Sequence, residues 1–221
     1  MHQTIYTFTD TQYRTALYRL VFFHIIIIAA SNYLVQFPFQ IFGIDTTWGA
    51  FTFPFIFLAT DLTVRIFGST LARKIIFCVM FPALAVSYVL SVLFHEGSWT
   101  GWHSLSQFNV FVGRIALASF TAYTFGQILD IFVFDKLRRN ASWWVAPAAS
   151  AVFGNALDTL LFFSVAFHES NNEFMKNNWP AIAWVDYLVK ITVCALFFLP
   201  AYGIILNILT KKLTASHKAR T

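Results

Sequence analysis

Two acid–base pairs at helical spacing are the residues most able to do chemistry in an apolar environment. Asp61 precedes Arg65 by four positions, and Asp186 precedes Lys190 by the same interval. Residues four apart lie on one face of a helix, and an acid N-terminal to a base is the more favourable order. Each pair can therefore neutralise itself while its helix enters a membrane, and can then face the interior of a helix bundle.

Further polar side chains interrupt the surrounding apolar stretches. Asn155, Asp158 and Thr159 share a helical face, and Asn32 lies in the first stretch. Other ionisable residues expected at membrane depth are Arg114, Asp130 and His24. Such a residue costs at least about 2.5–3.5 kcal/mol on insertion scales, so it is functional by default. The alternative is that these charges only hold the helices of the bundle together, but one or two ion pairs would be enough for that role. Polar groups on five of six helices favour a solute site.

The stretches that carry these residues are long enough to cross a bilayer. A helix spans the roughly 30 Å hydrocarbon core in about 20 residues. Apolar stretches of that length occur near residues 17–36, 46–67, 75–95, 108–131, 144–167 and 181–209, and the last can tilt or kink at Pro200. The sequence therefore predicts an all-α fold, in which residues 1–221 form a single transmembrane bundle of six helices.

Breaks within two spans point to an internal cavity. Gly49 and Pro54 interrupt the second span, and Pro147 and Gly154 interrupt the fifth. Backbone groups freed by such breaks are tolerated where they line a cavity. The alternative is that these residues only ease helix packing.

Composition supports a membrane protein and excludes other classes. Of 221 residues, 58% are hydrophobic and 11% are charged, against about 45–50% and 25% in soluble domains. A disordered chain and an ordinary soluble enzyme are therefore excluded. A signal peptide ending near Ala29-Ala30-Ser31 is a less favoured interpretation of the first span, because Asn32 and the residues after it continue that span.

The cations predict the orientation. Eleven of the 15 Lys and Arg residues fall at ends of spans on the side of the N-terminus, and the opposite loops carry only Lys176. The eleven are Arg14, Arg19, Arg73, Lys74, Lys136, Arg138, Arg139, Lys211, Lys212, Lys218 and Arg220. The positive-inside rule then places both termini in the cytoplasm. The net charge of +5 is a topology signal and does not indicate nucleic acid.

Signals for catalysis or metal binding are weak. The sequence has no phosphate-binding glycine loop followed by Lys and Ser or Thr, and its six histidines never occur at metal-binding spacing. Cys78 and Cys194 both fall inside apolar stretches and are expected to be small core residues without a disulfide. We expect no enzyme activity, no metal and no cofactor.

Four segments resemble the motifs of the queuosine precursor transporters. These belong to the vitamin uptake transporter family, which is related to the substrate-binding subunits of energy-coupling-factor importers. The segments are Phe53–Asp61 continuing through Arg65, Phe67-Gly68 and Ala72-Arg73-Lys74; Gly154–Thr159; Asp186–Lys190; and Ser31–Val35. The resemblance covers nearly the whole chain. One departure is Arg65, where many relatives carry a carboxylate, so a carboxylate role does not transfer to this position.

The resemblance implies uptake of 7-cyano-7-deazaguanine, and of its 7-aminomethyl analogue, for the queuosine modification of tRNA. It also implies a bacterial inner membrane, a deazapurine and the bilayer as the partners, and no dedicated ATPase. The alternative is a substrate-binding subunit of an energy-coupling-factor importer for another vitamin-like or nucleobase solute. Oligomeric state and the preferred precursor are left open.

The polar residues suit such a ligand. A deazaguanine presents an N1–H and an amine side by side, which match the two oxygens of a carboxylate. We expect Asp158 or Asp61 to take this donor edge, and Asn155 and Asn32 to read the oxygen and ring nitrogens. Phe55 or Phe162 would stack on the ring, at about 1–3 kcal/mol per stacked base. Arg65 and Lys190 would keep Asp61, Asp158 and Asp186 ionised.

Overall fold

The computed structural model describes residues 8–34, 38–41, 44–95, 98–139, 142–170 and 173–218. Its helices are α1 (Asp10–Leu34), α2 (Gly49–Thr52), α3 (Pro54–Phe67), α4 (Ser69–Leu93), α5 (Val110–Leu137), α6 (Val145–Phe167), α7 (Glu173–Val193) and α8 (Leu199–Lys218), with a π-helical segment (Cys194–Phe198) between the last two. Two antiparallel hairpins, β1 (Pro38–Ile41) with β2 (Ile44–Thr47) and β3 (Phe94–His95) with β4 (Ser98–Trp99), and a 3-10 helix (Trp102–Ser106) lie in the connections.

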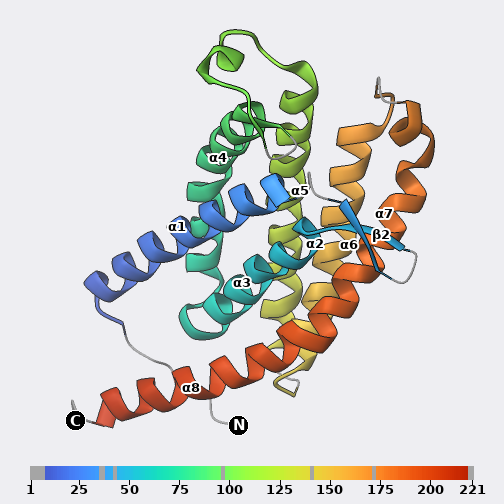
Figure 1. Ribbon diagram of the computed structural model, residues 1–221. Coiled ribbons are helices and arrows are strands. Elements are labelled where there is room, and N and C mark those ends of the chain that lie inside the picture. Colours follow the sequence, from blue (N-terminus) through green and yellow to red (C-terminus); the bar gives the residue numbers. More distant parts are fainter. Residues whose placement is uncertain are drawn as a thin grey trace.

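Six helices in this part of the chain are long and apolar enough to cross a membrane. They are Asp10–Leu34, Gly49–Phe67, Ser69–Leu93, Val110–Leu137, Val145–Phe167 and Glu173–Ala215, and they coincide with the six stretches expected from the sequence. The start of α1 and the end of α8 lie on the same side of the bundle, together with the α3–α4 and α5–α6 turns (Figure 1).

Several helices extend beyond the expected stretches: α1 begins at Asp10 rather than near residue 17, and α5 ends at Leu137 rather than near residue 131. α4 begins at Ser69 rather than near residue 75, because Gly68 adopts φ 91° and lets the chain turn at once from α3 into α4. The sixth span begins at Glu173 rather than near residue 181, so polar residues that were expected in a loop form the first turns of α7. Hydropathy alone marks the apolar part of a helix and misses such polar ends.

The expected breaks in the second and sixth spans are present, but the expected break in the fifth span is not: α6 runs without interruption from Val145 to Phe167, with Pro147 in its first turn, where a proline is tolerated. α2 and α3 are separate, and Pro54 occupies the first turn of α3, where its missing N–H costs nothing. The π-helical segment ends two residues before Pro200, which cannot donate to the carbonyl one turn earlier. The long sixth span changes direction here, so that α8 crosses beneath the bundle (Figure 1).

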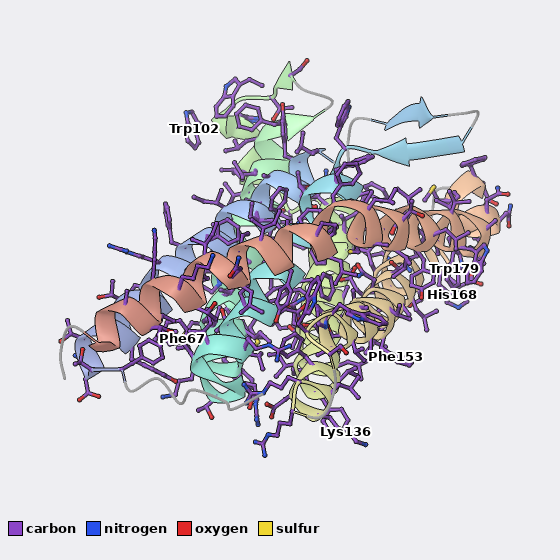
Figure 2. The ribbon with its side chains drawn as sticks, turned by 90° about the horizontal axis from the view of Figure 1, so that it is seen from below. Phe67, Trp102, Lys136, Phe153, His168 and Trp179 are labelled. Atoms are coloured by element: carbon purple, nitrogen blue, oxygen red, sulfur yellow. The ribbon has the colours of Figure 1, made fainter. Side chains whose placement is uncertain are left out.

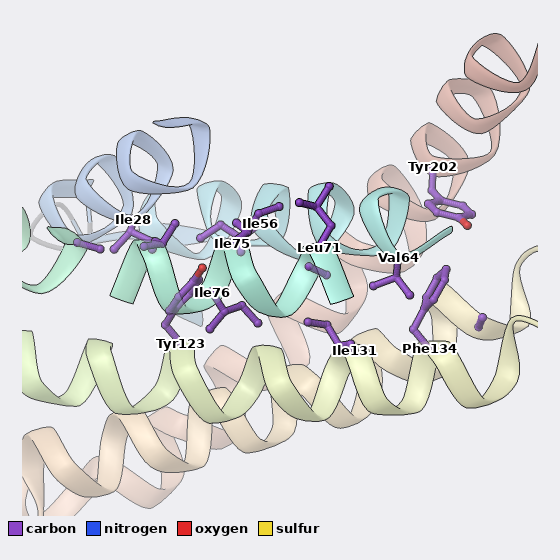
Figure 3. Close-up of a cluster of buried hydrophobic side chains, with 14 residues drawn as sticks. Ile28, Ile56, Val64, Leu71, Ile75, Ile76, Tyr123, Ile131, Phe134 and Tyr202 are labelled. Carbon is purple, nitrogen blue, oxygen red and sulfur yellow. The ribbon is translucent and has the colours of Figure 1, made fainter. Parts of the chain in front are cut away.

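A core of buried aliphatic and aromatic side chains joins α1, α3, α4, α5 and α8. Ile56 and Val64 of α3, Ile75 of α4 and Phe134 of α5 are at most 1% exposed, and Tyr202 brings α8 into the same cluster (Figure 3). α5 and α6 pack most extensively against each other. Glycines permit this approach, since a Cβ on Gly126 of α5 would lie 3.1 Å from the Asp158 Cβ of α6, and a Cβ on Gly154 of α6 would lie 3.1 Å from the Asp130 Cβ of α5.

The outer surface is apolar, as a bilayer requires. Phe153 on α6 is 55% exposed and points away from the bundle, with the long α7–α8 arm passing across the other helices (Figure 2). Comparable exposed side chains are Phe22, Phe77, Phe81, Phe132, Leu160 and Leu196. In a soluble domain an apolar surface of this extent would promote aggregation, whereas lipid covers it without cost.

Candidate functional site

An ion network joins α6 to α7 inside the apolar part of the bundle. Lys190 Nζ lies 3.2 Å from Asp158 Oδ2 and 2.7 Å from Asp186 Oδ2, and it donates to the Thr159 hydroxyl at 3.2 Å. The hydroxyl of Thr159 in turn donates to Asp186 at 3.2 Å. The Lys190 ammonium also lies 5.6 Å above the ring of Phe53, within cation–π range. The spacing of Asp186 and Lys190 correctly predicted their pairing, and Asp158 completes the network.

A second carboxyl group pair lies between α3 and α5. Asp61 and Asp130 are 4% and 0% exposed, and their carboxyl groups lie close enough to interact with each other. The Ser150 hydroxyl of α6 donates to both oxygens of Asp61, at 3.1 and 3.4 Å. Asp130 packs against the backbone of α6, since a Cβ on Gly154 would lie 3.1 Å from the Asp130 Cβ. Three helices therefore converge on two acids, and neither acid forms an ion pair with any residue that the structure describes.

Asp61 borders a cavity of about 120 Å³ between α3, α6 and the π-helical segment. The wall is largely apolar and aromatic: Pro54, Phe57, Leu58, Pro147, Ala148, Ala151, Val152, Ile191, Cys194, Ala195, Phe198, Leu199 and Tyr202 complete it. Pro54 and Pro147 are among the residues whose breaks were expected to line a cavity. An apolar pocket with one polar group aimed into it is typical of small-molecule sites. π-Helical segments within helices are frequent at functional sites as well.

Asn155 lies next to this cavity. Its amide nitrogen donates to the Ala151 carbonyl at 2.8 Å and approaches the Cys194 sulfur at 3.8 Å. Its side-chain oxygen is buried and has no hydrogen-bond partner among the described residues. A buried acceptor without a partner is costly, and a ligand with a suitable donor would satisfy it.

Arg65 does not pair with Asp61, contrary to the prediction from their spacing. Its guanidinium donates to the Tyr202 hydroxyl at 2.9 Å and to the carbonyls of Arg138 and Trp143 at 3.1 and 3.3 Å. The backbone carbonyls in the α5–α6 connection need hydrogen-bond donors, and the guanidinium supplies several. Arg65 is therefore directed toward this connection at the end of the bundle and away from Asp61. It still touches the cavity indirectly, because Tyr202 is part of the wall.

Arg114 was expected among the membrane charges, and it instead caps α6. Its guanidinium donates to the carbonyls of Val165 at 2.7 Å, Glu169 at 3.3 Å and His168. These carbonyls lie in and directly after the last turn of α6, where no intrahelical donor is left. The charge also complements the negative end of the helix dipole, so its role is structural.

Three predicted site residues lie apart from the carboxylates. Asn32 donates to Ser87 at 2.7 Å and accepts from Ser119 at 3.1 Å, which links α1, α4 and α5. Phe55 packs against Phe198 and lines a separate apolar groove of about 380 Å³ between α1, α3 and α8. Phe162 belongs to an apolar cluster between α5, α6 and α7.

Several neighbours of Asp61 were not among the predicted site residues. Asp130 is an acid within an apolar run, which is a signal that the sequence does carry. Ser150 had no distinguishing feature, because small hydroxyl residues are common in membrane helices. Phe57 and Cys194 could not be separated from other apolar residues, since only the three-dimensional packing brings them to the cavity.

Comparison with known proteins identifies the family. The family model described as "Putative vitamin uptake transporter" matches residues 47–205. The queuosine precursor transporter of Escherichia coli is 58% identical to this chain over 206 residues, which cover 93% of both proteins. The probable queuosine precursor transporters of Haemophilus influenzae and Bacillus subtilis are 55% and 28% identical, with coverage of 93% and 78% of this chain and 93% and 77% of the relatives. No solved structure matches significantly.

The matched residues 47–205 contain both carboxyl clusters, the cavity and five of the six spans in full or nearly so. High identity over almost the whole length extends this agreement to α1. The chain therefore belongs to the vitamin uptake transporter family and is a multi-pass membrane transporter rather than an enzyme.

Proposed function

We propose that this protein imports queuosine precursors across the bacterial inner membrane. The substrates are 7-cyano-7-deazaguanine and its 7-aminomethyl analogue, which serve the queuosine modification of tRNA. The names of the relatives supply the substrate class. The structural observation that carries the proposal is the Asp61 carboxylate at the wall of an aromatic-lined cavity, because it offers paired acceptors to the donor edge of a deazaguanine.

The proposed ligand site begins at this cavity. Asp61 takes the N1–H and the exocyclic amine, and Asn155 offers its unpartnered oxygen and its amide to the rest of the heterocycle. The rings of Phe57, Phe198 and Tyr202 border the space into which the bicyclic ring would fit. A cavity of about 120 Å³ must widen to hold the whole precursor, so binding is accompanied by movement of the π-helical segment or of α8.

The ion network extends the same site. Asp158 lies one turn after Asn155 on α6 and pairs with Lys190 of α7, and Lys190 supplies a donor for the carbonyl oxygen of the ligand. Asn32, Arg65, Phe55 and Phe162 remain proposed ligand residues, and they reach the deazapurine only in another state of the transport cycle. Alternating access provides such states, because helices move around a site near the middle of the membrane.

The proposed orientation has both termini in the cytoplasm. Eleven cations near the ends of α1, α3–α4, α5 and α8 support it, against Lys176 on the opposite side. Single cysteines introduced at Lys212 and at Lys176, in a variant without Cys78 and Cys194, test the orientation with a membrane-impermeant thiol reagent. Labelling of intact cells at position 176 only is the expected result, and labelling at position 212 would reverse the orientation.

The transport proposal is tested with the purified chain in liposomes. Labelled 7-cyano-7-deazaguanine should enter vesicles that contain this protein alone and should be recovered chemically unchanged. Empty vesicles are the first control, and E169Q is a second, because Glu169 forms a solvent-exposed ion pair with Lys176 outside the site. Uptake that requires added ATPases and a further membrane subunit would instead support a substrate-binding subunit of an energy-coupling-factor importer.

A further inference from the structure

The two carboxyl groups of Asp61 and Asp130 lie side by side in the interior of the bundle. Both side chains are nearly inaccessible, and neither forms an ion pair within the described part of the chain. The nearby basic groups are already engaged. Lys190 binds Asp158 and Asp186, and Arg65 donates to Tyr202 and to backbone carbonyls.

Hydrogen bonding distinguishes the two acids. Asp61 accepts from the Ser150 hydroxyl, which stabilises an ionised carboxylate. Both oxygens of Asp130 are buried and accept no hydrogen bond from any described residue. A neutral carboxyl group at Asp130 can donate to Asp61, whereas an ionised one would lie beside a second negative charge without any donor. Two adjacent carboxylates in such a place cannot both be ionised.

We propose that Asp130 holds a proton against Asp61 and that this proton is cotransported with the substrate. This inference rests on the proposed function, because Asp61 is the carboxylate that borders the ligand cavity. A second polar group at the same place also lacks a partner: the buried side-chain oxygen of Asn155 lies beside the cavity and accepts no hydrogen bond from any described residue.

The coupling of proton transport to substrate transport follows from the free-energy cost of burying charge when the site closes. Asp61 can take the donor edge of the ligand only as a carboxylate, and water leaves the site when the helices close around the ligand. Closure over one negative charge matched by ligand donors is tolerable, but closure over two adjacent charges is not. The loaded transporter therefore closes with Asp130 protonated. After the site opens to the cytoplasm, water can solvate both carboxylates and the proton can leave.

The other titratable groups around Asp61 and Asp130 do not take over the role of the proton between the two carboxyl groups. Arg65 follows Asp61 by one turn on α3, Cys194 faces the pair from the π-helical segment, and Tyr202 faces it from α8. On α7, the Lys190 ammonium serves the other two acids. His24 of α1 faces the Tyr123 hydroxyl of α5 at 3.1 Å rather than either carboxyl group.

The test uses proteoliposomes whose interior is one pH unit above the exterior, with the membrane potential clamped. With one proton per substrate, the native protein should accumulate labelled 7-cyano-7-deazaguanine up to about tenfold, because one pH unit corresponds to a factor of ten. D130N mimics a permanently neutral carboxyl group. It should equalise the ligand across the membrane and still exchange labelled for unlabelled ligand at equal pH.

D135N is the matched control. Asp135 lies on the same helix, pairs with Arg138 at 2.7 Å, and receives a hydrogen bond from Ser69. It is not among the residues that line the cavity, so D135N should accumulate ligand as the native protein does. Accumulation by D130N equal to that of the native protein would overturn the proposal. So would exchange without accumulation in the native protein.

Infrared spectroscopy tests whether Asp130 is protonated, and it does so without a transport measurement. The native protein near pH 7 should show the C=O stretch of a protonated carboxyl group, at a pH where ordinary Asp and Glu are ionised. The band should be present without ligand and missing in D130N, and its absence from the native protein would overturn the proposal even if D130N did not fold. A native protein that shows the band but neither uptake nor exchange would refute the proposed function and leave the proton site standing.

Discussion

The Lys190 ammonium lies 3.2 Å from the Asp158 carboxylate, and this ion pair ties α7 to α6 within the apolar interior. Lys190 is shared, because Asp186 on its own helix lies 2.7 Å away. Two acids and one base leave the network one negative charge in excess. Substitution of one acid or of the base should therefore have different effects.

D158N should abolish uptake and leave the protein folded in the membrane. Lys190 keeps Asp186 as its partner, so no buried charge is left alone, while the proposed site loses the carboxylate that pairs with Lys190 from α6. Uptake in proteoliposomes and the amount of folded protein in detergent are the two measurements. Unimpaired uptake would remove Asp158 from the site.

K190M should lower stability as well as uptake. Loss of the ammonium leaves two buried carboxylates without a cation, and breaking such a pair costs about 3–5 kcal/mol. Thermal unfolding in detergent should show this loss, and D158N/K190M should recover part of it. K176M is the matched control, because Lys176 pairs with Glu169 in solvent. A similar melting temperature for K176M and K190M would contradict a structural role of the buried network.

Much of the fold was predictable because the bilayer imposes simple rules. A span needs about 20 apolar residues, and all six spans meet this requirement. The Asp186–Lys190 pair was predictable for a similar reason, since residues four apart in a helix are neighbours wherever the helix lies.

Contacts between different helices could not be predicted from the spacing of residues along the sequence. Asp61 and Arg65 also differ by four positions, but Arg65 turns to the carbonyls at the α5–α6 junction, which only the folded chain brings near. The neighbour of Asp61 is instead Asp130, 69 positions later in the sequence. Nothing in the local sequence of either acid specifies that partner.

R114Q should destabilise the protein without changing the affinity for the ligand. The substitution removes donors from three carbonyls at the end of α6, and a buried or half-buried acceptor without its partner costs about 1–3 kcal/mol. Thermal unfolding measures the first effect, and ligand binding to the purified protein measures the second. A large change in affinity with unchanged stability would place Arg114 in the transport pathway.

G154A should impair both folding and uptake. The added methyl group would lie 2.7 Å from the Phe57 ring and 3.1 Å from the Asp130 Cβ, in a region fixed by three helices. G113A is the matched control, because its Cβ would meet only the ring of Phe108, which is 72% exposed and free to move. Overpacking in a core costs about 1–3 kcal/mol. Equal uptake and equal melting temperatures in the two variants would show that the α5–α6 contact tolerates the methyl group.

Substrate should protect Cys194 from alkylation. Its thiol borders the same cavity as Asp61 and is 6% exposed, so a maleimide reaches it only when the cavity opens. The C78A variant leaves Cys194 as the single reactive thiol, since the chain has two cysteines. Labelling should slow as 7-cyano-7-deazaguanine is added, with half-protection near its dissociation constant, and adenine should have no effect. Because D61N lacks the carboxylate that receives the donor edge, the precursor should not protect Cys194 in C78A/D61N. Equal protection of C78A and C78A/D61N would place the ligand against Cys194 without the Asp61 carboxylate and would remove Asp61 from the site.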